Sequence, residues 1–199
     1  NNRGGIYLGN LHLNKIDNNT CNSNIFTGIE LDASTYNDIL RNTLNFNGYG
    51  MYFSRAHRNY LFNNTCVSNA ATGIHLYRSE RNVLVNNTCV SNRNSGIFLS
   101  NADWNTFFNN TCNLHSSSGI AASSADYNIF IGNILENNDR AGIDISSSIS
   151  NTLSNNIMNN NGISISGSSS IRWDSHSIDN TNIVNGKPVY YWKNKNGGK

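Results

Sequence analysis

The most regular feature of the chain is an alternation of apolar and polar positions that recurs at a fixed spacing. Each unit begins at a glycine, and successive glycines lie 23, 22, 23, 23, 23, 23 and 20 residues apart. Apolar residues stand one and three positions after each glycine, as Ile74 and Leu76 do after Gly73. A period of two is typical of strands, and a repeat of this length is typical of solenoids. The pattern therefore predicts strands stacked in successive coils. The glycines are Gly5, Gly28, Gly50, Gly73, Gly96, Gly119, Gly142 and Gly162.

Asparagine marks the boundaries between the strands of each unit. In the unit that begins at Gly73 these residues are Asn82, Asn87 and Asn92, and nearly every other unit has asparagine at the same places. Asparagine tolerates the left-handed backbone of tight turns, and stacked side-chain amides can bond to one another. We therefore predict an all-β fold, a right-handed single-stranded parallel β-helix. It would have about eight coils of 20–23 residues, three strands per coil, and asparagine ladders at the turns.

The repeat changes near the end of the chain. Ile171, Trp173 and His176 stand where ladder residues are expected, and the segment NGKPVYYW follows with an Asn185-Gly186 hairpin signal. We predict a repeat domain at 1–170, and a last coil with a non-repeat capping or tail segment at 171–199. Because the chain opens in mid-repeat at Asn1, we expect a fragment or mature form of a longer protein.

Composition narrows the function classes. Only 13% of residues are charged and the formal net charge is +2, with no basic run, so nucleic acid is not an expected partner. No apolar stretch is long enough to predict a membrane span.

The cysteines occupy a position that other units fill with leucine or methionine. We therefore expect Cys21, Cys66, Cys89 and Cys112 to be buried free thiols. No paired cysteine spacing exists, so we predict no metal site and no cofactor.

Outward positions of the first strand carry aromatic and charged side chains. Ring faces can stack on sugars, and carboxylates and guanidinium groups can bond to hydroxyls. High strand propensity alone also explains exposed aromatic residues. The predicted carbohydrate-binding residues are Tyr7, Glu30, Asp32, Tyr52, Arg55, His75, Tyr77, Arg78 and Phe98.

Two carboxylates of this strand are the candidate catalytic pair. Glu30 and Asp32 lie on one face of one strand, with Cα atoms about 7 Å apart, which overlaps the carboxylate spacing of inverting glycosidases. Asp144 lies five coils away, about 24 Å, too far to cooperate with them. If the protein is an enzyme, Glu30 and Asp32 are the predicted catalytic residues.

The second strand is apolar on its outer side as well as its inner side. Such a face predicts coverage by the chain's own tail or by a partner, including self-association. The predicted interface residues are Leu40, Tyr60, Phe62, Val83, Val85, Phe108, Ile129 and Ile131.

The third strand carries four N-x-T motifs. Their acceptor asparagines, Asn18, Asn63, Asn86 and Asn109, are predicted glycosylation sites if the cell that secretes the protein glycosylates it.

Units of the form GIxLxxSxxNxLxNNTCxxN, followed by HSID and NIVNGKPVYYW, resemble the parallel β-helix repeat proteins of the NosD-like group. They resemble above all the large secreted surface proteins of methanogenic archaea. The resemblance covers essentially the whole chain and implies a right-handed β-helix, an extracellular or cell-surface location, and a domain type described as carbohydrate-binding and sugar-hydrolysing. The copper role of the group's named member is not expected here, because the five histidines are scattered over different coils.

We therefore expect a non-catalytic extracellular or cell-surface module that contacts polysaccharide or an envelope glycan. One alternative is a polysaccharide hydrolase or lyase that uses the outer face of the first strand. A second alternative is a structural rod that assembles through the apolar second-strand face.

Overall fold

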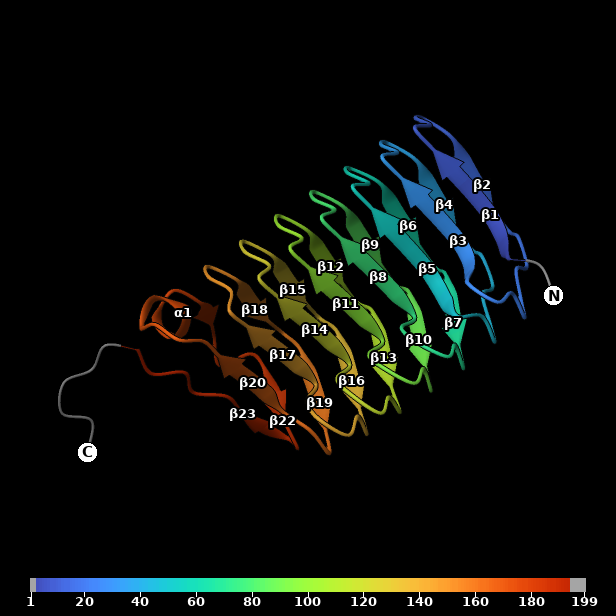
Figure 1. The fold of residues 1–199 in the computed structure, drawn as a ribbon. Helices are drawn as coiled ribbons and strands as arrows, with labels where there is room; N and C mark the ends of the chain where they lie inside the picture. Colours follow the sequence, from blue (N-terminus) through green and yellow to red (C-terminus); the bar gives the residue numbers. More distant parts are fainter. Residues whose placement is uncertain (1–2, 194–199) are drawn as a thin grey trace.

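The protein is a right-handed parallel β-solenoid, as the repeat predicts. A computed structural model describes residues 3–193 and shows about eight coils stacked into a rod, with the first and last described strands at opposite ends of the rod (Figure 1). Three sheets of mainly parallel strands run along the rod, and most coils contribute one strand to each sheet. Residues 1–2 and 194–199, which belong to the two predicted domains, lie outside the described part.

The first sheet contains the strands that follow each repeat glycine. Equal repeat positions pair between neighbouring coils, as Ile97 does with Ile74 and Ile120. The strands, in sheet order, are β1 (Gly4–Gly9), β3 (Thr27–Asp32), β5 (Tyr49–Ser54), β8 (Ile74–Tyr77), β11 (Ile97–Ser100), β14 (Ile120–Ser123), β17 (Ile143–Ser146) and β20 (Ile163–Ser166).

The second sheet also has one strand from every coil. Its strands are β2 (Lys15–Asp17), β4 (Asp38–Leu40), β6 (Tyr60–Phe62), β9 (Val83–Val85), β12 (Thr106–Phe108), β15 (Ile129–Ile131), β18 (Thr152–Ser154) and β21 (Ser177–Ile178).

The third sheet begins later than the other two. In the first two coils, bridges from Thr20 to Thr43 and from Thr43 to Thr65 take the place of full strands. Its strands are β7 (Thr65–Val67), β10 (Thr88–Val90), β13 (Thr111–Asn113), β16 (Ile134–Glu136), β19 (Ile157–Asn159), β22 (Ile183–Val184) and β23 (Lys187–Pro188).

The core consists of columns of identical or similar side chains stacked along the rod axis. The repeat glycines stand where one coil approaches the next most closely. A Cβ atom at Gly73 would lie 2.6 Å from the carbonyl oxygen of Gly96 and 2.9 Å from the sulfur of Cys89. The glycine is therefore required by space. All four cysteines are free and buried, as the sequence predicts.

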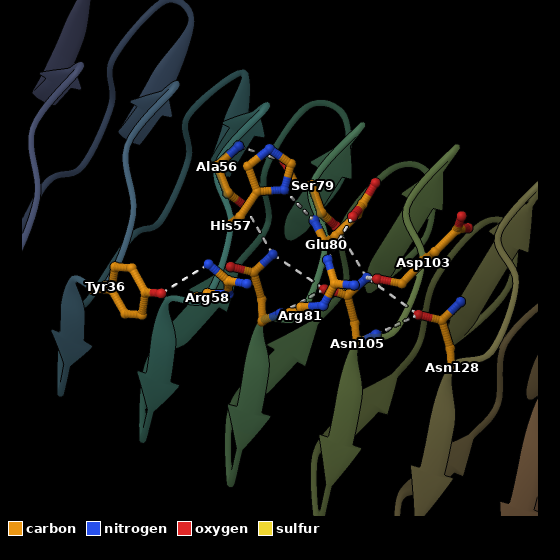
Figure 2. Close-up of polar contacts among 11 residues, drawn as sticks. Tyr36, Ala56, His57, Arg58, Ser79, Glu80, Arg81, Asp103, Asn105 and Asn128 are labelled. Carbon is orange, nitrogen blue, oxygen red and sulfur yellow. Dashed lines mark hydrogen bonds and ion pairs between the residues drawn. The ribbon is translucent and has the colours of Figure 1, made fainter.

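The asparagine ladders are present at all three turns. Asn105 is a representative member of the first ladder (Figure 2): its side chain donates to the carbonyl of Ser79 at 3.0 Å and to Oδ1 of Asn128 at 3.2 Å. Its backbone N–H donates to the same Oδ1 atom at 2.8 Å. Each buried amide thus satisfies backbone groups of neighbouring coils that would otherwise lack partners.

The eighth coil is more complete than the sequence pattern suggests. His176 takes the asparagine place in the first ladder, where its Nδ1 accepts the backbone N–H of Asn151 at 3.2 Å. Asn182 continues the second ladder and accepts from Nδ2 of Asn156 at 2.8 Å. The extra residues form a short helix, α1 (Ile171–Asp174), between β20 and β21. The repeat therefore continues through an insertion instead of ending before it.

The tail closes the C-terminal end of the rod. Strands β22 and β23 pair antiparallel through the predicted hairpin, with Asn185 and Gly186 at φ of 48° and 75°. Beyond it, Val189 and Tyr191 pack against the hydrophobic core. Within residues 3–193, no helix is long and apolar enough to cross a membrane.

Candidate functional site

Residues two positions after each repeat glycine form one column across the outer face of the first sheet. We call it the central column. Strand pairing places Glu30 between Tyr7 and Tyr52, and His75 between Tyr52 and Phe98. In rod order the column reads Tyr7, Glu30, Tyr52, His75, Phe98, Ala121, Asp144 and Ser164.

The middle of the column is an aromatic cluster. The ring centroids of Tyr49 and Tyr52 lie 5.4 Å apart, those of Tyr52 and His75 5.2 Å apart, and those of His75 and Phe98 4.8 Å apart. Burial lowers the pKa of His75 to about 4, so its ring is neutral at neutral pH. Tyr49, whose ring lies 5.7 Å from that of His75, precedes its repeat glycine and was missed by the sequence pattern. The four rings thus lie in contact with one another on the outer face of the first sheet.

The two candidate catalytic carboxylates have different partners. Arg55 donates to Asp32 Oδ1 at 2.7 Å, and this bond lowers the pKa of the Asp32 carboxyl group. Glu30 accepts a hydrogen bond from Thr27 Oγ1 at 3.3 Å. A general acid needs a raised pKa, so the Arg55 contact makes Asp32 unsuited to that role. Nothing in this geometry assigns an acid and a base to the pair.

Arg78 lies at the turn that follows Tyr77. Its guanidinium carbon is 5.2 Å from the centroid of the Tyr77 ring, which is a cation–π distance. The first sheet therefore has a polar margin beside the aromatic cluster, formed at Asp32, Arg55 and Arg78.

Cavities lie along the same face. They are lined on one side by the third turns, which join the third strand of one coil to the first strand of the next. A cavity of about 450 Å³ is lined by Glu30 and Tyr52 on the sheet and by Phe26 and Tyr49 on the turn side. A second cavity, of about 300 Å³, adjoins Tyr7 and shares Glu30 and Phe26. A third, of about 350 Å³, lies further along the rod. The nine predicted carbohydrate-binding residues lie on one face of the rod. Tyr7 is not part of the aromatic cluster, and it is 63% exposed.

The outer face of the second sheet is apolar and solvent-exposed. Tyr60, Val83, Phe108 and Ile129 are each 36–41% exposed, and Tyr60 stacks on Phe62 with centroids 6.1 Å apart. In the described part of the chain the tail packs at the end of the rod, away from this face (Figure 1). Coverage by the chain's own tail is therefore not observed for residues up to 193. The interface role of these residues stays a prediction.

The four N-x-T asparagines are exposed at tight turns. Asn18, Asn63, Asn86 and Asn109 have φ of 58°, 54°, 55° and 55°. Their side chains are accessible, and their use as glycosylation sites stays a prediction.

The first turn, which joins the first and second strands of each coil, carries a row of exposed side chains that the sequence analysis did not predict. Trp104 and Tyr127 stack with ring centroids 4.2 Å apart, and Arg58 donates to the hydroxyl of Tyr36 at 2.8 Å (Figure 2 shows the latter pair). All four have φ between 55° and 60°, which bulky residues rarely adopt. All four stand eight residues after the glycine of their unit, and this common repeat position is the signal that could have found them.

The chain belongs to the family whose model is described as "Periplasmic copper-binding protein (NosD)", which matches residues 1–197. No curated protein matches the sequence.

The family description raises the question of a copper site. Among residues 3–193, no group of three or more His, Cys, Asp or Glu side chains is placed to hold a metal ion. The stacked thiols Cys66, Cys89 and Cys112 are sealed in the core with 0% exposure. The side chains of residues 3–193 do not fit a copper centre.

Solved structures of similar fold include the periplasmic alginate epimerase AlgG, with a TM-score of 0.78 and 20% identity over 91% of this chain and 47% of that one. The A-module of the Azotobacter vinelandii mannuronan C-5 epimerase AlgE4 gives a TM-score of 0.71 and 15% identity over 90% and 56%. Pectate lyase Pel9A gives 0.55 and 10% over 76% and 52%. At these identities the likeness shows the fold alone, and the chain spans about half the length of each of these structures.

Proposed function

We propose that this chain is a non-catalytic module that binds a carbohydrate or envelope glycan along the outer face of the first sheet, outside the cytoplasm. The observation that carries the proposal is the aromatic cluster of Tyr49, Tyr52, His75 and Phe98 beside open cavities. Ring faces next to carboxylates and guanidinium groups provide both the stacking surface and the polar contacts that a sugar chain needs.

Two further observations support this proposal. Several solved structures of the same fold are named for alginate, mannuronan and pectate. The family description names the periplasm, and this supports an extracytoplasmic location. Against a role of Asp32 as general acid, Arg55 donates a hydrogen bond to its carboxylate and lowers its pKa.

The test is a panel of polysaccharides measured in two ways, as retention of the protein on each polymer and as release of new chain ends. The double variant Tyr52→Ala/Tyr77→Ala should lose retention. The double variant Trp104→Ala/Tyr127→Ala is the matched control, because it removes exposed aromatic surface from the first turn instead of the first sheet. Equal loss in both double variants would contradict the assignment of the face.

The enzyme alternative is favoured by the epimerase and lyase names among the structures of similar fold. In the same panel it requires chain-end release that disappears in Glu30→Gln or Asp32→Asn while the fold persists. Such a result would replace the binding module with a polysaccharide-cleaving enzyme.

The rod alternative rests on the exposed apolar face of the second sheet. It predicts concentration-dependent assembly in sedimentation velocity, weakened by Phe62→Lys or Phe108→Lys. A monomer at all concentrations would remove this alternative.

A further inference from the structure

The cavity of about 350 Å³ lies near the C-terminal end of the first sheet, away from the predicted binding residues except Phe98. Its floor is the part of the central column formed by Phe98, Ala121 and Asp144, which lie on the neighbouring strands β11, β14 and β17. Because the side chain of Ala121 is a single methyl group between two larger residues, the column is hollowed there. The size is at the lower end of small-ligand sites.

The walls of this cavity are polar. Asn94, Ser95, Ser117 and Arg140 line it from the third turns. Hydroxyl and amide groups can both donate and accept hydrogen bonds, so these walls suit a ligand with many hydroxyl groups. The ring of Phe98 supplies an apolar surface on the floor.

Asp144 is the unusual member of the cavity. It is only 6% exposed, and its Oδ2 atom pairs with Nη2 of Arg140 at 3.0 Å. Its Oδ1 atom is buried and has no hydrogen-bond partner among the described residues. A buried acceptor without a donor is unfavourable, so a ligand that donates a hydrogen bond here would be stabilised. The Arg140 side chain is 61% exposed, so it can shift to admit such a ligand.

We propose that this cavity is a subsite for a neutral hydroxylated sugar ring, and that it discriminates against uronates. This inference rests on the proposed glycan binding along the same face. A sugar hydroxyl can donate to Asp144 Oδ1, whereas the carboxylate of a uronate brings only acceptors and a like charge. Arg140, the cation of the cavity, is already paired with Asp144.

In this proposal the central column contacts one glycan chain in two regions, one at Glu30 and one at Asp144. Glu30 and Asp144 occupy equivalent positions five coils apart, about 24 Å, with the aromatic cluster between them. This separation, which excludes cooperation in one catalytic step, is compatible with contacts to different rings of one bound chain.

The test is isothermal titration calorimetry of the full chain with matched tetrasaccharides that differ only in oxidation at C6. The pairs are mannotetraose with tetramannuronate, cellotetraose with tetraglucuronate, and α-1,4-galactotetraose with tetragalacturonate. For at least one pair we expect the neutral member to bind tenfold or more tightly than the uronate.

Two variants locate this preference in the cavity. Asp144→Asn should weaken neutral binding about tenfold and reduce the discrimination, because it removes the charged acceptor. Ala121→Phe should abolish the preference by filling the hollow while leaving Asp144 in place. Asp139→Asn, an exposed carboxylate next to Arg140 in the chain but outside the cavity, is the control and should bind as the unmodified chain does.

The outcomes separate the two proposals. If the chain is retained on polymers but prefers the uronate members, the subsite is wrong and the binding module stands. The same conclusion follows if the chain is retained and neither Asp144→Asn nor Ala121→Phe changes the preference. Tyr52→Ala should weaken both members of a pair equally and preserve their ratio. The absence of binding to every polymer and tetrasaccharide overturns both proposals.

Discussion

Replacing Asn87 with leucine tests the ladder that holds successive coils in register. The Asn87 side chain is fully buried, and its Oδ1 accepts from the backbone N–H and the side-chain amide of Asn64 at 3.0 and 2.9 Å. Its Nδ2 donates to the carbonyl of Leu61 at 3.1 Å and to Oδ1 of Asn110 at 3.0 Å. Leucine has a similar shape but can form none of these hydrogen bonds.

Some of the affected groups keep other partners. The Asn64 amide still donates to the carbonyl of Ile39 at 2.7 Å, and Asn110 Oδ1 still accepts the backbone N–H of residue 87 at 3.0 Å. The backbone N–H of Asn64 loses the side-chain oxygen it donates to. One unsatisfied buried donor costs about 1–3 kcal/mol, and the other lost bonds bring the expected loss to about 3 kcal/mol. For a domain of this size this corresponds to a melting temperature lower by roughly 6–12 °C.

The assay is urea unfolding together with amide hydrogen exchange at Asn64. Asn87→Leu should lower the free energy of unfolding and reduce the protection of the Asn64 amide. Asn86→Gly, at an exposed neighbouring position with φ of 55°, is the control and should change the free energy little, because glycine adopts this conformation readily. Unchanged exchange at Asn64 together with an unchanged unfolding free energy would refute the ladder as a source of stability.

Two further predictions concern buried titratable groups. Because the pKa of His75 is lowered to about 4 in the folded chain while the unfolded value is near 6.5, its stabilising contribution is present above pH 6.5 and is lost as the pH falls towards 4. The melting temperature of His75→Phe should therefore fall less between pH 7 and 4.5 than that of the unmodified chain, and equal falls would contradict the assignment. Cys89, with 0% exposure, should react with a thiol reagent only at the rate of unfolding, and rapid labelling in the native state would show that the core is open there.

The sequence by itself determined the solenoid, its ladders and its core. Each coil pairs with the next at equal repeat positions, as Cys89 does with Cys66 and Cys112, so a one-dimensional period specifies the three-dimensional stacking directly. For the same reason the alternation along each strand showed which side chains of the first sheet face outward.

Only the tertiary structure decided which outward side chains meet. Tyr49 joins the aromatic cluster because the third turn of its coil folds against the sheet. Arg140, in the third turn of a later coil, pairs with Asp144 in the same way. The ladder role of His176 depends on an inserted helix that restores the register, which no fixed spacing reveals. Side chains at the turns reach neighbours through their rotamers and through the turn's path. Repeat position alone therefore places a residue on a face without specifying its partners there.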